Sequence, residues 1–266
     1  MIGYVNFPAW LRPEVISGFP IRWYGLMYLL AFFITFQLFF FIAVKERRLN
    51  TDKDTILNLF FWGVLAVLIG GRIFSVLIYD PTGYYLDNPI DIFKIWEGGM
   101  SFHGGLLGVI VGTHIFAKSI KTETFLFLDV IACVAPIGIF FGRIANFING
   151  ELFGKPTNVS WSVIFPEVDN IPRHPSQLYE AFFEGVLLFL ILISFIYIKK
   201  VKTGYCSGLF LIFYGFFRIL AEQFREPDLQ ICYLFNYFSL GSILSFVMVI
   251  VGILILLKIK RNERTT

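Results

Sequence analysis

The sequence predicts an all-α, polytopic membrane protein with about seven transmembrane helices and a small extracytoplasmic cap. Hydrophobic residues make up 57% of the 266 residues and charged residues only 15%, and the mean hydropathy is +0.73. Phenylalanine alone accounts for 33 residues, and a soluble core could not bury so many large side chains without leaving apolar patches exposed. Because these values lie outside the range of soluble globular proteins, we expect lipid to surround most of the chain.

Seven apolar runs are long enough to cross roughly 30 Å of hydrocarbon as helices. In chain order they are Trp23–Val44, Thr55–Ile78, Met100–Ala117, Phe125–Phe141, Leu178–Ile198, Gly204–Leu220 and Phe235–Leu257. The third and fourth runs are short and contain glycine or proline, which helices packed between neighbours tolerate. Six or eight spans therefore remain as alternatives.

Basic residues follow the first, third, fifth and seventh runs and are scarce in the other loops. They are Lys45, Arg47, Arg48, Lys53, Lys118, Lys121, Lys199, Lys200, Lys202, Lys258, Lys260, Arg261 and Arg264. Because short loops rich in Lys and Arg stay in the cytoplasm, we expect an extracytoplasmic N-terminus and a cytoplasmic C-terminus. The long loop of about residues 149–175, rich in Pro, Asn and Gly, would then form the cap. No basic residue precedes Arg12 and no cleavage pattern follows, so we expect no signal peptide.

The net charge and the cysteine spacing argue against a nucleic-acid partner, a disulfide framework and a thiolate metal site. The net charge is only +3 and is spread over the loops, so we expect no nucleic-acid partner. The three cysteines, Cys133, Cys206 and Cys232, are widely separated and form no Cys-x-x-Cys pair, which indicates neither a disulfide framework nor a thiolate metal site. We interpret them as packing residues and expect no metal and no cofactor.

Polar residues within or beside the apolar runs fall almost entirely at their predicted outer ends. The candidates are Tyr24, Arg72, His103, Arg143, Asn146, Asn149, Glu151, Gly154, Tyr214, Arg218, Glu222 and Arg225. Tyr214, Arg218 and Glu222 are spaced four residues apart and therefore share one helix face. Since ionisable residues at membrane depth face the bundle interior and mark functional sites, we expect these segments to converge on one polar cavity near the outer leaflet.

Each of these groups also has a simpler interpretation. Arg218 and Glu222 could form a purely structural ion pair, and Tyr24 is typical of an interfacial aromatic belt. His103, among glycines at a helix start, either takes part in chemistry or orients and packs its neighbours. The stretch from Arg143 to Glu151 is harder to explain structurally, because it places a guanidinium, two carboxamides and a carboxylate within three helical turns.

Five stretches of sequence carry the identification further. The most specific is Gly-Arg-Ile-Ala-Asn-Phe-Ile-Asn-Gly-Glu-Leu-Phe-Gly at residues 142–154. The others are Trp-Tyr-Gly-Leu-Met-Tyr at 23–28, Gly-Gly-Met-Ser-Phe-His-Gly-Gly at 98–105, Arg-His-Pro-Ser-Gln-Leu-Tyr-Glu at 173–180, and Tyr-Gly-Phe-Phe-Arg through Glu222 to Arg-Glu-Pro-Asp at 214–228. Together they strongly resemble the prolipoprotein diacylglyceryl transferase family of bacterial inner membranes.

The resemblance implies a multi-pass protein of the bacterial inner membrane that acts as a single catalytic domain over residues 1–266. It implies phosphatidylglycerol as the donor of a diacylglyceryl group. The implied acceptor is the lipobox cysteine thiol at the end of a prolipoprotein signal peptide, with membrane lipids around both substrates. A thioether would form, and glycerol phosphate would leave.

The residues in the matching stretches suit this chemistry. Negative charge builds on the leaving phosphate, and guanidinium groups in a low-dielectric site stabilise it, so Arg143 and Arg218 are expected in that role. The thiol must attack as a thiolate, and His103 is the expected base, alone or aided by the positive field of the arginines. The expected substrate-binding residues are Tyr24, Arg72, Asn146, Asn149, Glu151, Gly154, Tyr214, Glu222 and Arg225, with Glu222 also holding Arg218 in place.

Two other function classes are weaker. A membrane transporter of an anionic or lipidic substrate is the alternative, but it needs a polar path to the cytoplasmic face, where Asp129 and Glu184 are nearly the only intramembrane charges. An intramembrane serine protease would need a serine near a histidine, whereas Ser207 lies at the predicted cytoplasmic end of its span, far from His103.

Overall fold

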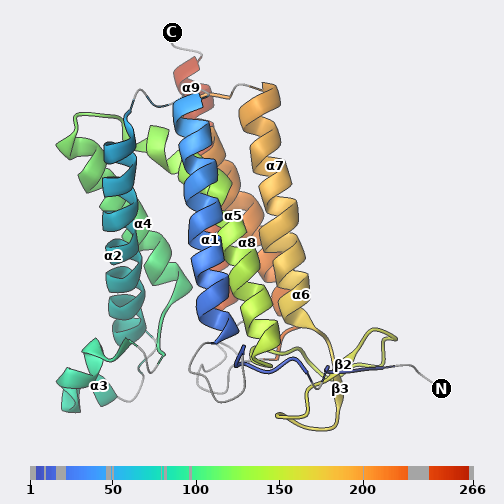
Figure 1. Cartoon of the computed structure of the whole chain (residues 1–266). Helices are drawn as coiled ribbons and strands as arrows, with labels where there is room; N and C mark the ends of the chain where they lie inside the picture. Colours follow the sequence, from blue (N-terminus) through green and yellow to red (C-terminus); the bar gives the residue numbers. More distant parts are fainter. Residues whose placement is uncertain are drawn as a thin grey trace. The chain divides into compact units, whose positions relative to one another are not determined.

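A computed structural model describes residues 4–8, 10–15, 22–45, 49, 51–78, 80, 83–95, 98–199, 201–226 and 240–263. Most of this part of the chain is helical (Figure 1). The chain forms two compact units. Unit 1 consists of Met1–Phe39 and Ile131–Thr266, and unit 2 of Phe40–Val130.

Unit 1 is a bundle of helices. Its single helices are α1 (Trp23–Phe40), α5 (Thr124–Ile148), α8 (Tyr205–Glu222) and α9 (Leu240–Glu263). Helix α1 continues into the π-helical turn η1 (Phe41–Lys45) of unit 2, and α5 belongs to unit 1 from residue 131 on. The fifth member is a continuous rod made of α6 (Ser176–Glu180), η4 (Ala181–Leu187), α7 (Leu188–Ser194) and η5 (Phe195–Lys199). In this rod η4 and η5 are π-helical. The rod approaches α5 closely, because a Cβ at Gly185 would lie only 2.7 Å from the Cβ of Phe140. Glycine at this position therefore lets the two backbones meet, as small residues do between membrane helices.

A small cap covers one end of unit 1, opposite the C-terminus (Figure 1). Its three-stranded sheet pairs β1 (Val5–Asn6) in parallel with β2 (Val163–Ile164), and β2 antiparallel with β3 (Pro172–Arg173). Behind the sheet, the buried ring of Phe165 contacts the rings of Phe7, Phe147 and Phe153 at centroid distances of 5.6, 6.0 and 6.2 Å. This aromatic cluster joins the N-terminal strand and the end of α5 to the loop of residues 149–175.

Besides η1 and the first residues of α5, unit 2 contains two packed helices, α2 (Lys53–Ile78) and α4 (Phe102–Ser119). A short segment between them holds α3 (Tyr84–Asp87) and the 3₁₀ helix η2 (Pro89–Phe93). The two long helices pack through glycine, since a Cβ at Gly104 would lie 2.4 Å from the carbonyl oxygen of Gly70.

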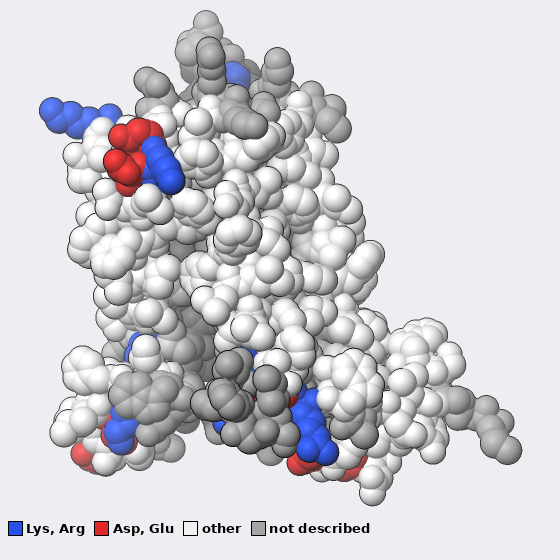
Figure 2. All heavy atoms as spheres, in the orientation of Figure 1, with Lys and Arg blue, Asp and Glu red and all other residues white. Residues whose placement is uncertain are grey.

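The predicted all-α, polytopic membrane fold is confirmed. Six described helices are long and apolar enough to cross a membrane: Trp23–Val44, Lys53–Ile78, Thr124–Ile148, Ser176–Tyr197, Tyr205–Glu222 and Gly241–Asn262. The third predicted run forms α4, which is less apolar than these six because it contains two histidines and four glycines. On the face shown in Figure 2, the charged side chains of each unit lie toward the helix ends, as expected for helices whose middles contact lipid.

Most helix ends lie close to the predicted ones, but two helices extend well beyond the predicted run. Helix α5 continues to Ile148 instead of ending at Phe141, because Arg143 and Asn146 find polar partners within unit 1 and need no water. Helix α9 continues to Glu263 instead of ending at Leu257. The predicted start of that run, Phe235, lies outside the described residues, as do all of residues 227–239, Cys232 included.

Candidate functional site

The last turns of α5 carry the first polar pair of unit 1. Arg143 and Asn146 are three residues apart and so project from one side of the helix. Asn146 is buried, and the Arg143 side chain is only 14% exposed. Because lipid does not solvate a guanidinium and the group does not lose its proton, burial at this depth requires an anionic partner.

That partner is a pair of carboxylates on the neighbouring rod. The Nε atom of Arg143 lies 2.9 Å from Oε2 of Glu180, and its Nη2 atom lies 3.1 Å from Oε2 of Glu184. Both carboxylates are completely buried. They are four residues apart on the rod, so both side chains project toward α5.

Helix α8 supplies the second guanidinium. Nη1 of Arg218 lies 2.6 Å from Oε1 of Glu180 and 3.6 Å from Oε1 of Glu184, while Nη2 lies 2.8 Å from Oε2 of Glu222. The last of these pairs is the i, i+4 pair that the sequence suggested. Tyr214, one turn before Arg218, is buried on the same helix.

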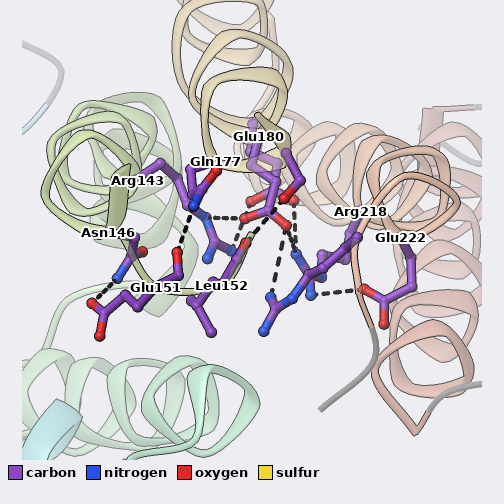
Figure 3. A network of polar contacts seen from close by, with 11 residues as sticks. Arg143, Asn146, Glu151, Leu152, Gln177, Glu180, Arg218 and Glu222 are labelled. Atoms are coloured by element: carbon purple, nitrogen blue, oxygen red, sulfur yellow. Dashed lines mark hydrogen bonds and ion pairs between the residues drawn. The ribbon is translucent and has the colours of Figure 1, made fainter. Parts of the chain in front are cut away.

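Glu180 is therefore the centre of an ion-pair network that spans three segments (Figure 3). A third guanidinium joins it after α8, where Nη1 of Arg225 lies 3.7 Å from Oε1 of Glu180. We call the following six residues the Glu180 cluster: Arg143, Glu180, Glu184, Arg218, Glu222 and Arg225. Three guanidinium groups and three carboxylates give the cluster no net formal charge.

The cluster is rigid for energetic reasons. Removing one partner from a buried ion pair leaves the other charge unsolvated, which typically costs about 3–5 kcal/mol. The guanidinium groups are thus fixed before any ligand arrives. Among the described residues, no hydrogen bond or ion pair uses Nη1 of Arg143, so this atom can donate to an incoming anion. Such fixed donors in a dry site are the arrangement that stabilises developing negative charge.

The loop that follows α5 is tied to the same helices. Nδ2 of Asn146 donates to Oε1 of Glu151 at 2.7 Å. Nε2 of Gln177 donates to the carbonyl oxygen of Glu151 at 2.6 Å, and Oγ of Ser176 donates to that of Leu152 at 2.9 Å. Glu151 itself is exposed. Asn146 therefore orients a carboxylate at the edge of the cluster.

Two further predicted site residues lie in this loop. The amide of Gly154 donates to the carbonyl oxygen of His174 at 2.9 Å, and a Cβ at position 154 would lie 2.4 Å from that oxygen. Any larger residue would force apart the two ends of the cap loop, which meet here. Asn149 is half-buried, and its Oδ1 atom is buried without a hydrogen-bond partner among the described residues.

Arg173 forms two ion pairs outside the membrane-spanning segments, one within the cap and one to the residues that follow α8. Arg173 contacts Asp169 at 2.7 Å and Glu226 at 3.1 Å. The hydrogen bond from Arg173 keeps the pKa of Asp169 below its ordinary value, and the same bond raises the pKa of Arg173. Burial lowers the pKa of His174, whose Nδ1 lies 3.2 Å from the hydroxyl of Tyr179. His174 is accordingly neutral at pH 7.

Tyr24 lies in the first turn of α1 in unit 1. It is 36% exposed, and its hydroxyl lies 3.2 Å from the hydroxyl of Tyr28, which is also exposed. A side chain with this exposure is accessible to a ligand.

The remaining predicted residues, His103 and Arg72, belong to unit 2. His103 lies in the first turn of α4, is half-buried, and meets the ring of Phe102 edge-on at 5.7 Å. Its helix is capped by Ser101, whose Oγ accepts from the amide of Gly104 at 3.3 Å. The guanidinium of Arg72 is buried and donates to four backbone carbonyl oxygens, those of Asp91, Ile92, Gly98 and Gly99.

Sequence reasoning missed the residues at the centre of the site. Glu180 and Gln177 lie in a matching stretch that leads into the predicted fifth span, and Glu184 is an intramembrane charge, but none of the three is among the predicted site residues. The available signal was two carboxylates spaced four residues apart in an otherwise apolar helix, because such a pair must face buried cations. Among the described residues, no group of three or more His, Cys, Asp or Glu side chains is arranged to hold a metal ion.

Comparisons with known proteins agree with the motifs. Residues 14–258 match the family model described as prolipoprotein diacylglyceryl transferase. A phosphatidylglycerol–prolipoprotein diacylglyceryl transferase of Rickettsia akari is 46% identical over 240 residues, which cover 89% of this chain and 92% of that protein. The enzymes of the same name from Rickettsia bellii (45% over 259 residues, 96% and 97% covered) and Polynucleobacter necessarius (46% over 260 residues, 97% and 97% covered) are similar along nearly their whole length.

Proposed function

Because the chain belongs to the prolipoprotein diacylglyceryl transferase family, we propose that it transfers the diacylglyceryl group of phosphatidylglycerol to the lipobox cysteine of a prolipoprotein. The names of its relatives supply the donor and the acceptor protein. The lipobox cysteine, carried by a signal peptide, follows from the motif resemblance. The transporter alternative gains no support, since each relative named above is a transferase.

The Glu180 cluster is the observation that carries this proposal. Phosphatidylglycerol presents a phosphodiester, and the reaction turns it into a phosphate monoester with more negative charge. Arg143 and Arg218, both bound to Glu180 at 2.9 and 2.6 Å, are two planar donors held in fixed orientations. Guanidinium groups bind phosphate oxygens bidentately and stabilise the added charge.

The reaction balances without a cofactor. The cysteine sulfur attacks the carbon of the diacylated glycerol that bears the phosphate. A carbon–sulfur bond forms, and the bond between that carbon and the phosphate oxygen breaks. Glycerol phosphate leaves with the bonding electrons. The thiol proton passes to a base, for which we propose the imidazole of His103, a group whose ordinary pKa of about 6.5 suits proton transfer at neutral pH.

The other predicted residues would position the substrates. We propose that Tyr24 and the carboxylate of Glu151, oriented by Asn146, contact the acceptor or the glycerol head group. Asn149, which lies between Asn146 and Glu151 in the sequence, offers a buried acceptor atom, Oδ1. Gly154 and Tyr214 would shape the site through close packing, and Glu222 and Arg225 would complete the charge balance around Glu180.

We also propose a location and an orientation. Loops after the first, third, fifth and seventh predicted spans hold most of the basic residues, which supports a cytoplasmic position for these loops in a bacterial inner-membrane protein. The N-terminus and the cap loop would then lie outside, with the whole chain of 1–266 acting as one catalytic domain. A thiol probe at position 158, introduced as Asn158→Cys, should react with a membrane-impermeant reagent from the extracytoplasmic side. Labelling from the cytoplasmic side alone would reverse the topology.

The transfer itself is tested with purified protein. Incubation with phosphatidylglycerol and a synthetic lipobox peptide should yield a peptide heavier by one diacylglyceryl group in a thioether linkage, together with glycerol phosphate, both detected by mass spectrometry. A peptide with serine in place of the cysteine is the matched control and should remain unmodified. Absence of the thioether product from folded protein would refute the proposed function.

Direct transfer predicts that the enzyme's own cysteines are dispensable. Cys133 and Cys206 are buried, and Cys232 has no Lys, Arg or His within several residues of sequence to favour its thiolate. Replacing all three by alanine should keep at least about half of the transfer rate if stability is unchanged. Loss of product that Cys232 alone restores would instead require a covalent diacylglyceryl-enzyme intermediate.

A further inference from the structure

The segment between α2 and α4 exposes a row of large apolar side chains. Leu86, Ile90 and Phe93 are 87%, 75% and 77% exposed, among the highest values for the large hydrophobic residues that the structure describes. They lie on α3 and η2, between the end of α2 and the start of α4. We call residues 83–95 the arm. Three such side chains together on a short element mark an interaction surface.

Charged and polar residues lie between and beside these apolar side chains in the arm. Nζ of Lys94 lies 2.6 Å from Oδ1 of Asp91, and the hydroxyl of Tyr84 donates to Oδ2 of the same residue at 2.6 Å. These two contacts, with Lys94 the larger, hold the pKa of Asp91 below its ordinary value, so the carboxylate is charged at neutral pH. Asp87, next to Leu86, is exposed. Charged heads beside large apolar side chains are typical of segments that lie in a membrane interface.

Arg72 fixes the arm to α2. Its Nε and Nη2 atoms donate to the carbonyl oxygens of Ile92 and Asp91 at 2.7 and 2.5 Å, and its guanidinium carbon lies 5.0 Å from the centre of the Tyr85 ring. With these groups engaged by the chain itself, the exposed row is held in one orientation. All three guanidinium nitrogens of Arg72 thus donate to backbone carbonyl oxygens of the chain.

The return from the arm to α4 is equally constrained. Nη1 of Arg72 donates to the carbonyl oxygens of Gly98 and Gly99 at 2.7 and 3.1 Å. Both glycines have positive φ, +94° and +70°, and a Cβ at Gly99 would lie 2.6 Å from Nη1. The amide of Ser101 then donates to the carbonyl oxygen of Gly71 at 3.0 Å. The Arg72 side chain therefore holds the arm and its return, and the backbone of Gly71 holds the start of α4.

Lipid is the partner that the neighbouring surface indicates. The last turns of α2, a membrane-spanning helix by length and composition, expose Ile73, Leu77 and Ile78 at 52%, 72% and 50%. This apolar surface must contact hydrocarbon up to the end of the helix. The arm begins within a few residues of that end, so an α2 that ends where the hydrocarbon ends would bring the arm beside the lipid head groups.

We propose that the arm lies in the membrane interface, with Leu86, Ile90 and Phe93 inserted among the lipids, and that Arg72 is the residue that fastens it there. Under the proposed orientation this is the extracytoplasmic leaflet. If His103 acts as proposed above, the arm also holds the turn that carries it at the depth of the phospholipid head groups. The proposal about the arm itself does not depend on the transfer reaction.

Spin labelling tests the position of the arm. Single cysteines are introduced as Leu86→Cys, Ile90→Cys and Phe93→Cys, with Asp87→Cys as the matched control, in the full chain lacking its three native cysteines. After nitroxide labelling and reconstitution into vesicles of phosphatidylcholine and phosphatidylglycerol, accessibility to oxygen and to a water-soluble nickel chelate is measured by power saturation. Labels at the three row positions should be more accessible to oxygen than to nickel, and the label at Asp87 should show the reverse.

Two outcomes would overturn the proposal. Nickel accessibility at the row equal to that at Asp87 would place the arm in water, and low accessibility to both reagents would show that protein, such as a second copy of the chain, covers it. Arg72→Gln tests the fastening: the label at Phe93 should become more mobile and more accessible to nickel. Unchanged spectra in that variant would remove Arg72 from the proposal, and the transfer assay on the same samples reports separately on the proposed function.

Discussion

Glutamine at position 180 would keep the shape of the side chain that joins Arg143 to Arg218 but would remove its charge. The wild-type carboxylate is completely buried and lies 2.9 Å from one guanidinium and 2.6 Å from the other. At a charge separation of about 4 Å and an effective dielectric constant of about 20, each pair gains about 4 kcal/mol before desolvation. The variant would leave three guanidinium groups with two carboxylates in a buried site.

The net cost is smaller than this gross attraction, because the wild-type protein also has to desolvate the carboxylate. Loss of one partner from a buried pair costs about 3–5 kcal/mol, and glutamine still accepts one hydrogen bond, so we expect about 3 kcal/mol. For a chain of this size that corresponds to a fall in Tm of roughly 6–12 °C. Turnover should also fall at least tenfold, which is about 1.4 kcal/mol, since the two guanidinium groups lose their common anchor.

The assay combines thermal unfolding in detergent with the transfer reaction below the Tm of the variant. Glu226→Gln is the matched control, because Glu226 makes one ion pair among the described residues and its side chain is 41% exposed, a setting in which the loss is at most about 1 kcal/mol. A Glu180→Gln protein as stable and active as this control would refute the role of Glu180. Lower stability with full turnover at low temperature would show that the cluster is structural only.

Three further predictions concern other charged groups. Arg143→Lys should lower turnover more than tenfold, about 1.4 kcal/mol of transition-state stabilisation, because lysine lacks the planar fork; near-normal activity would show that a point charge suffices. His103→Gln should keep the fold, judged by Tm, while losing most turnover, and full activity would exclude His103 as the base. The pKa of Asp169 is lowered in the folded protein by Arg173, so its stabilisation is present above the unfolded pKa of about 4 and is lost as pH falls through the folded value. The Tm difference between wild type and Asp169→Asn should therefore be present at pH 7 and vanish in acid, and a difference that persists in acid would contradict this assignment.

The membrane fold could be predicted from the chain because each span carries its own signal. A run of apolar residues long enough to cross the bilayer is stable there whatever its neighbours, since its backbone hydrogen bonds are satisfied within the helix. Composition alone therefore indicated the all-α class, and α4 was the difficult element because its histidines and glycines weaken that signal. The end of α5 was predicted too early for a related reason: polar residues end an apolar run in the sequence, but buried partners let the helix continue through Arg143 and Asn146.

The family could also be recognised from the sequence, because the stretch at residues 142–154 is a local pattern that needs no structure to read. The set of polar residues near the ends of the helices could likewise be read from the sequence, because it depends only on where each residue falls in its apolar run. Their individual roles, as substrate ligands or as supports, remain predictions, and the i, i+4 pair of Arg218 and Glu222 is one contact that spacing did anticipate.

Only the tertiary structure decided which groups are joined. Arg143 and Glu180 are far apart in sequence, and no periodicity links a residue at the end of one helix to a carboxylate on another. Their contact depends on the close approach of the rod to α5 at Gly185. Arg72 illustrates the same limit, because its partners are backbone carbonyls that have no signature in the sequence. Local energies determine where helices form, whereas long-range packing determines which charge is neutralised by which, and that information is distributed over the whole chain.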